Sequence, residues 1–257
     1  MARIVTASQR AQLAAVQRQV EGVAARERTL PVVPALGGLL PQGVQRGSVV
    51  GCAGPAAVSL ALAVMAGASQ AGAWVVAAGL PGLGLAAAEE MGVVAARLVQ
   101  VVEPAAEPWD DARWGDVLAA MVDGFDMVLV GPGAQGVRPA TARRVTARLQ
   151  ARGAVMVCVG APAFGADLLL GSEQHQWAGL GDGHGVATSR RVAAVLEGRR
   201  VPRPRRAVLW LPAAGGQVRA GTPAAADAAD VVAAAAAAEA AVAVADVATV
   251  VALQRTG

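Results

Sequence analysis

The sequence contains no lysine, asparagine or tyrosine, and Ile4 is its single isoleucine. All 22 basic residues are therefore arginines. Because the codons of the missing residues are AT-rich, this usage indicates a GC-rich genome rather than selection for one function. The absence of lysine still has a chemical consequence. A phosphate-binding loop in this chain cannot use the lysine that normally neutralises the β- and γ-phosphates.

Cysteine and charge are also scarce. Cys52 and Cys158 are the only cysteines, and each lies in a short apolar stretch, which is typical of core thiols in a reducing cytoplasm. Their spacing predicts neither a disulfide framework nor a metal site. Apolar residues make up 55% of the chain and charged residues 16%, which excludes disorder for its main body. The net charge of +3 is modest and does not by itself indicate nucleic acid.

No charged residue occurs from Gly47 to Ala88, which raises the question of a membrane span. Glycine, proline and Gln70 interrupt this run, so it lacks the roughly 20 uninterrupted apolar residues that a spanning helix needs. The N-terminus is polar and has no apolar signal core. We therefore expect buried strands and helices of a cytoplasmic protein that does not enter a membrane.

Short apolar runs alternate with helical patterns in the middle of the chain. Strands are expected at Ser48–Cys52, Trp74–Ala78, Leu98–Val102, Met127–Val130 and Val155–Val159. Helices are expected at Ala57–Ala71, Leu83–Met91, Trp109–Val122 and Thr141–Arg152. This alternation predicts an α/β fold with a mainly parallel sheet that helices cover on both faces.

The flanking regions have different patterns. Residues 1–29 are expected to hold an exposed helix, and the Pro- and Gly-rich stretch that follows is irregular. Beyond Pro162, four short strands predict an antiparallel extension at the sheet edge: Asp167–Leu170, Gln174–Ala178, Arg190–Leu196 and Ala207–Leu211. Residues 30–212 therefore form the predicted core domain, and residues 213–257 an Ala/Val-rich tail or helix.

The segment from Gly51 to Leu60 lies between a predicted strand and a predicted helix, where a P-loop would lie. A working P-loop reads G-x-x-x-x-G-K-[ST]. When the motif is aligned without a gap from Gly54, Leu60 stands at the lysine position. When a shorter loop is assumed, Ala57 stands at the lysine position and Val58 at the hydroxyl position. The Mg²⁺-binding acid after Met127–Val130 is replaced by Gly131, and the catalytic glutamate position after Trp74–Ala78 is Gly79. These losses predict no catalytic activity and no nucleotide or metal cofactor.

Three segments resemble RecA proteins. Leu39–Gly51 is similar to the RecA entry into its P-loop, Met91–Pro104 to the segment around L-G-V…L-L-x-x-Q-P, and Phe125–Val130 to V-D-V-I-V-V without its final aspartate. The resemblance covers residues 30–200 and implies a RecA-like sheet, with the strand after the Walker B strand beside the P-loop strand. Cys52 and Cys158 should then lie on neighbouring strands, buried and reduced.

Among RecA-like proteins, the lost motifs, the arginine-rich segment and the ending Leu209–Pro212 resemble the ImuA family, particularly its ImuA-prime form. The resemblance implies a non-catalytic adaptor of a damage-induced mutasome that supports error-prone translesion DNA synthesis. Its implied partners are ImuB, an inactive relative of Y-family polymerases, and indirectly an error-prone replicative-type polymerase. Two alternatives stay open: a cell-division inhibitor of the SulA type, and an ATPase with an atypical site.

Two arginine clusters are candidate contacts for a protein partner or, weakly, for DNA. The first comprises Arg199, Arg200, Arg203, Arg205 and Arg206. The second places Arg144, Arg148 and Arg152 on one face of a helix. A solvated surface is the competing interpretation of both clusters. The apolar residues of the tail are candidates for helical docking to a partner: Val247, Val250, Val251 and Leu253.

Overall fold

The computed structural model describes residues 28–180 and 184–222, with the side chains of Pro162, Gln174 and His175 left aside. The described residues up to Ala220 belong to one compact unit, and Gly221 and Thr222 belong to a second. The predicted N-terminal helix lies outside the described residues except for Arg28. The tail with its four candidate docking residues, from Val247 to Leu253, also lies outside them.

Nine strands of the described chain form one mixed sheet in the order β11-β10-β9-β8-β3-β7-β6-β4-β5. The strands are β3 (Val49–Ala53), β4 (Val75–Ala78), β5 (Leu98–Val101), β6 (Met127–Val130), β7 (Val155–Val159), β8 (Leu168–Leu180), β9 (Gly185–Glu197), β10 (Arg205–Trp210) and β11 (Arg219–Ala220). Pairing is parallel from β5 through β8 and antiparallel from β8 to β11. A separate antiparallel pair joins β1 (Thr29–Leu30) to β2 (Val44–Gln45).

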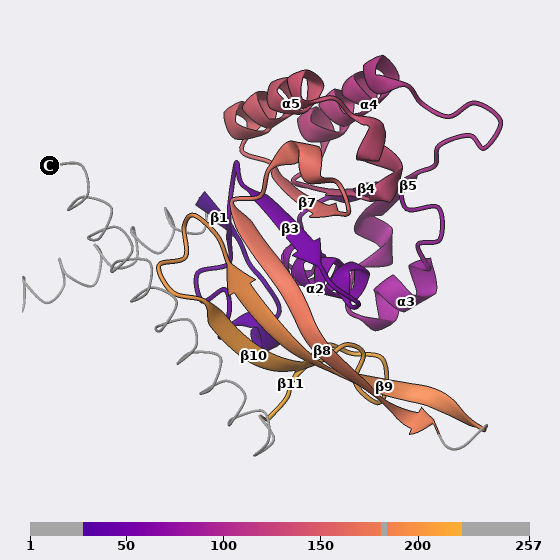
Figure 1. Cartoon of the computed structure of the whole chain (residues 1–257), viewed down its shortest axis with the longest axis vertical. Coiled ribbons are helices and arrows are strands. Elements are labelled where there is room, and N and C mark those ends of the chain that lie inside the picture. Colours follow the sequence, from indigo (N-terminus) through magenta and orange to yellow (C-terminus); the bar gives the residue numbers. More distant parts are fainter. Residues whose placement is uncertain (1–27, 181–183, 223–257) are drawn as a thin grey trace, which may run out of the picture. The chain divides into compact units, whose positions relative to one another are not determined.

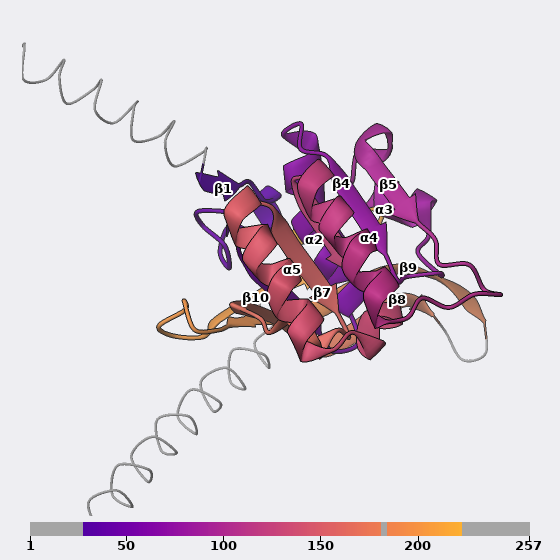
Figure 2. The same cartoon turned by 90° about the horizontal axis from the view of Figure 1, so that it is seen from above.

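Helices cover both faces of the parallel strands (Figure 1). One face carries α2 (Ala57–Gln70) and α3 (Leu85–Glu90), and the other carries α4 (Asp111–Gly124) and α5 (Pro139–Arg152), which lie side by side in Figure 2. Short 3-10 turns occur at η1 (Pro34–Leu36), η2 (Ala95–Arg97), η3 (Pro132–Gly136) and η4 (Pro162–Phe164). The α/β prediction with helices on both faces is confirmed.

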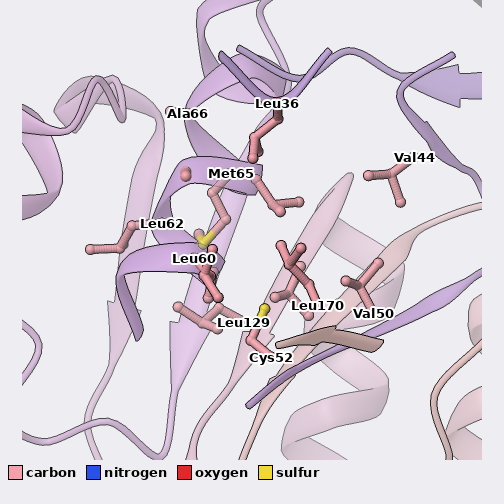
Figure 3. Close-up of a cluster of buried hydrophobic side chains, with 14 of the residues drawn as sticks. Leu36, Val44, Val50, Cys52, Leu60, Leu62, Met65, Ala66, Leu129 and Leu170 are labelled. Carbon is pink, nitrogen blue, oxygen red and sulfur yellow. The ribbon is translucent and has the colours of Figure 1, made fainter. Parts of the chain in front are cut away.

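Helix α2 explains the long uncharged run. Every residue from Leu60 to Ser69 is buried, so the helix is apolar on all sides because protein surrounds it. Figure 3 shows Leu60 and Met65 packed with Leu129 and Leu170 of the sheet. No helix among the described residues is long and apolar enough to cross a membrane.

The sheet separates two apolar clusters because successive side chains of a strand point to opposite faces. In β4, Val75 and Ala77 pack toward α2, whereas Val76 and Ala78 pack toward α4 and α5. Helix α4 begins at a capping residue, Asp110, whose Oδ1 accepts a hydrogen bond from the Arg113 N–H at 2.8 Å.

The two cysteines lie on neighbouring strands, as expected. Gly51 of β3 is paired with Cys158 of β7, so Cys52 is offset by one residue and faces the opposite side of the sheet. Both are free and buried. Burial raises the pKa of Cys158 to about 12 and that of Cys52 further, so both thiols stay protonated at neutral pH.

The antiparallel extension was predicted with the wrong number of strands. Asp167–Leu170 and Gln174–Ala178 are not two strands but belong almost entirely to the single strand β8. The apolar pattern breaks at Gly171 and Ser172, where the register shifts between Ser172 and Gln174. A bulge of this kind interrupts the alternation without ending the strand.

Candidate functional site

The loop between β3 and α2 is a tight turn. Gly54 has a φ of +84°, a left-handed conformation that favours glycine, and its carbonyl accepts a hydrogen bond from the Ala57 N–H at 3.1 Å. Of the two residues aligned with the missing lysine, Ala57 begins α2 and Leu60 is fully buried in the core. A charged side chain at Leu60 would therefore point into apolar packing and not toward a phosphate.

Ser172 of β8 fills the space beside this loop. Its Oγ accepts the Ala56 N–H at 2.9 Å and donates to the Ala53 carbonyl at 3.3 Å. A Cβ added at Gly54 would come within 2.3 Å of the Ser172 carbonyl oxygen. A P-loop turns its backbone N–H groups toward phosphate oxygens, and here one such N–H is already bonded within the protein.

Arg190 of β9 fixes the first turn of α2. Its guanidinium is buried, donates from Nε to the Leu211 carbonyl at 2.9 Å and also bonds the Ser59 hydroxyl. It lies over the Trp177 ring, 4.9 Å from the ring centroid. Burial lowers the pKa of Arg190. The hydrogen bonds that the structure gives this side chain among the described residues go to neutral oxygens.

The two positions of the lost acids contact each other. The Gly131 N–H donates to the Ala78 carbonyl at 2.9 Å, and the Gly133 N–H donates to the Gly79 carbonyl at 3.0 Å. A Cβ at Gly131 would lie 2.2 Å from Leu80 Cγ and 2.4 Å from the Gly79 carbonyl oxygen. Packed backbone and Leu80 therefore occupy the space that a carboxylate after β6 would need.

The helix α5 arginines have partners within the described chain. Arg148 binds Asp123 of α4 through two nitrogens, Arg152 reaches the same carboxylate at 3.1 Å, and Arg144 donates to the Thr141 hydroxyl at 3.2 Å. Hydrogen bonding from Arg148 lowers the pKa of Asp123. The Arg148 and Arg152 contacts tie α5 to α4 and the Arg144 contact lies within α5, so the structure gives this cluster a local role in addition to any contact with a partner.

The second arginine cluster divides by its contacts. Arg199 and Arg200 share the carboxylate of Asp167, at 3.3 and 3.8 Å, and Arg206 pairs with Glu173. Arg203 is exposed. Arg205 differs, because its Nη1 donates to the Leu39 carbonyl oxygen at 2.8 Å and not to a carboxylate.

Two of these arginines, Arg200 and Arg205, line an open cavity of about 1500 Å³ at the amino ends of the parallel strands. Its lining includes Ser48, Ala73, Asp126 and Leu168, each of which begins one of the strands β3, β4, β6 and β8 or lies within two residues before it. A second cavity, of about 240 Å³, lies at the carboxyl ends of β4 and β5. Neither cavity is lined by a residue from Gly54 to Leu60.

Comparison with known proteins gives the family. The model of the MT3502 N-terminal domain matches residues 38–164. The chain is also 35% identical, over 150 residues, to the uncharacterized protein Rv3395c of Mycobacterium tuberculosis, an alignment that covers 58% of this chain and 67% of that protein. The chain belongs to this MT3502 family.

The matched domain ends at Phe164, just before β8. It includes Gly54, Gly79 and Gly131, but Ser172, Arg190 and Arg205 lie beyond it. Sequence reasoning missed the roles of Ser172 and Arg190. Ser172 is 116 residues from Ala56 and Arg190 is 131 residues from Ser59, and no local pattern links positions so far apart.

Proposed function

We propose that this protein is a non-catalytic, RecA-like adaptor of a damage-induced mutasome, as the ImuA resemblance implies, and that it binds an ImuB-like protein. The observation that carries the proposal is the filled space at the carboxyl ends of β3 and β6. Ser172 fills the space beside the loop after β3, and Leu80 with the Gly79 backbone occupies the acid position after β6.

The strand order supports the RecA-like part of the proposal. Strand β7, which follows the Walker B-like strand β6 in the chain, pairs with the P-loop-like strand β3, and β8 flanks β3 on its other side. The RecA resemblance implies that the strand after the Walker B-like strand lies beside the P-loop-like strand, as β7 lies beside β3 here. The strand order therefore supports the interpretation of Gly79 and Gly131 as replacements of specific acids rather than unrelated turn residues.

Nucleotide binding and partner binding test the proposal separately. Labelled ATP with Mg²⁺ at millimolar concentration should not bind the purified chain above the level of an unrelated protein. Saturable binding would instead favour the ATPase with an atypical site. The same preparation should co-purify with an ImuB-like protein, and failure to do so would remove the mutasome assignment.

Deletion of residues 221–257, which keeps β11 intact, then locates the contact. Loss of co-purification would assign docking to the tail with Val247, Val250, Val251 and Leu253. Retained co-purification would assign it to the core or to residues 1–29. A tubulin-like division polymer serves as the control partner, because binding to it would favour the SulA-type alternative.

A further inference from the structure

The cavity at the amino ends of the strands combines positive charge with apolar walls. Among the described residues of its lining, Arg28, Arg46, Arg200 and Arg205 are basic and Asp126 is the one acid, so these residues carry a net formal charge of +3. Asp126 is already engaged, since its carboxylate accepts hydrogen bonds from Arg46 at 3.1 Å and from the Trp74 N–H at 3.1 Å. Arg200 and Arg205 are not among the partners that the structure gives this carboxylate.

Arg205 and Arg200 are the best placed of these cations to bind a ligand. Arg205 is exposed at the start of β10, and the partner that the structure gives its guanidinium is a backbone carbonyl. Arg200 donates to Gln45 Oε1 at 2.6 Å, and its contact with Asp167 is longer, at 3.8 Å, whereas Arg199 approaches the same carboxylate at 3.3 Å. A guanidinium prefers a carboxylate to a neutral oxygen, because a carboxylate carries a full negative charge and can accept two parallel N–H bonds from the planar fork.

The size and walls of the cavity decide between ligand classes. Its volume of about 1500 Å³ exceeds the roughly 300–1,000 Å³ of small-molecule pockets, so a segment of polypeptide fits it better. Leu30, Val33, Leu40 and Val201 contribute apolar wall. No lining residue in the described part of the chain is aromatic, which disfavours single-stranded nucleic acid, because such strands bind by stacking bases on aromatic rings.

We propose that this amino-end cavity binds an acidic segment with apolar side chains on the adaptor's protein partner, with Arg200 and Arg205 as the carboxylate contacts. The inference rests on the proposed adaptor function and adds the surface and the chemistry of the partner. Charge complementarity also argues against residues 1–27 as the occupant, because they carry four arginines and two glutamates.

Charge reversal in the full chain tests the proposal. Arg200→Glu combined with Arg205→Glu should weaken binding of the purified ImuB-like protein by about tenfold or more. The matched control is Arg113→Glu with Arg143→Glu, which makes the same charge change at exposed positions of α4 and α5. The control should stay within about twofold of the unaltered chain. Equal binding by all three proteins would overturn the inference and leave the adaptor function standing.

A second measurement keeps the native charges. A photo-crosslinking residue is placed at Val201, inside the cavity. It should capture a peptide of the partner that is acidic, with more Asp and Glu than Lys and Arg, and that also contains apolar residues. The same residue at Val99, in the edge strand β5, should not capture that peptide. Capture of a basic peptide, or of the same peptide from both positions, would overturn the inference.

Two further outcomes are distinguished by the same reagents. If the unaltered chain does not bind the ImuB-like protein at all, the proposed function fails and the inference falls with it. Fluorescent oligo-dT and duplex DNA are titrated in parallel. If the cavity variant loses binding to DNA but keeps its partner, the cavity is a nucleic-acid surface and the inference is wrong.

Discussion

At the carboxyl ends of β3 and β6, side chains and backbone fill the space above the sheet, whereas at the amino ends of the same strands the sheet opens into a cavity of about 1500 Å³. The filled end holds Ser172, Leu80 and the turn at Gly131 in direct contact with the loops. At the open end, Arg205 donates a hydrogen bond to a backbone carbonyl and Arg200 donates one to an amide side chain.

This difference reverses the usual arrangement of open α/β sheets, in which ligands bind at the carboxyl ends of the strands. The close contacts at the carboxyl ends of β3 and β6 leave little room for a ligand there, so we expect them to contribute to stability. We expect the exposed arginines at the amino end to contribute less to stability. The four predictions below test this contrast.

The largest effect is expected from restoring an acid at the filled end. Gly131→Asp places a Cβ within 2.4 Å of Leu80 Cγ and the Gly79 carbonyl oxygen, so the backbone must move. We expect the free energy of unfolding to fall by about 3 kcal/mol or more. Gly136→Asp is the control, because nothing lies within 4 Å of a Cβ there. Chemical denaturation measures both, and an unchanged stability of Gly131→Asp would show that the end is not closed.

Removal of the buried guanidinium is expected to have the next largest effect. Arg190→Leu leaves the Leu211 carbonyl and the Ser59 hydroxyl without their donor. A loss of about 2 kcal/mol in the free energy of unfolding follows, because unsatisfied buried groups retain their desolvation cost. Arg203→Leu, at an exposed position, should change stability by less than about 0.5 kcal/mol. Similar values for both variants would mean that Arg190 does not hold the first turn of α2.

Acid should weaken the contacts between α4 and α5. The Arg138 N–H and the Thr141 hydroxyl lower the pKa of Asp111, and Arg148 lowers that of Asp123. A carboxyl with a lowered pKa stabilises the fold above its unfolded pKa of about 3.9, and this contribution is lost as the pH falls through the folded pKa. Unfolding free energies at about pH 5 and pH 3 should therefore differ less after Asp111→Asn and Asp123→Asn than in the unaltered chain. An identical difference would contradict the ion pairing.

The smallest effect on stability is expected at the open end. Arg205→Ala removes an exposed side chain that bonds one backbone carbonyl, so the free energy of unfolding should change by about 0.5 kcal/mol or less. A thermal denaturation curve is sufficient to check this. A loss comparable to that of Arg190→Leu would mean that the amino-end arginines are structural, which would remove the contrast between the two ends.

Much of the fold follows from local patterns. The apolar runs at Met127–Val130 and Val155–Val159 are strands with the predicted bounds, and the uncharged helix after Gly54 is buried as expected. The bulged strand β8 was divided in two, because the alternation that identifies a strand is interrupted where its register shifts. The arginine clusters were found from charge density and helical spacing, which cannot distinguish an arginine paired with a carboxylate from one that lines a cavity.

The sequence by itself determined that the chain has an α/β core and lacks a lysine and the acids of a nucleotide site, because composition and short-range periodicity carry that information. Only the tertiary structure decided what occupies the vacated positions. Ser172 and Arg190 reach the loop across more than 110 residues, and strands β3, β4, β6 and β8 bring their amino ends to one cavity. Such contacts arise from strand order and register, which bring residues distant in the chain together and leave no pattern in the local sequence.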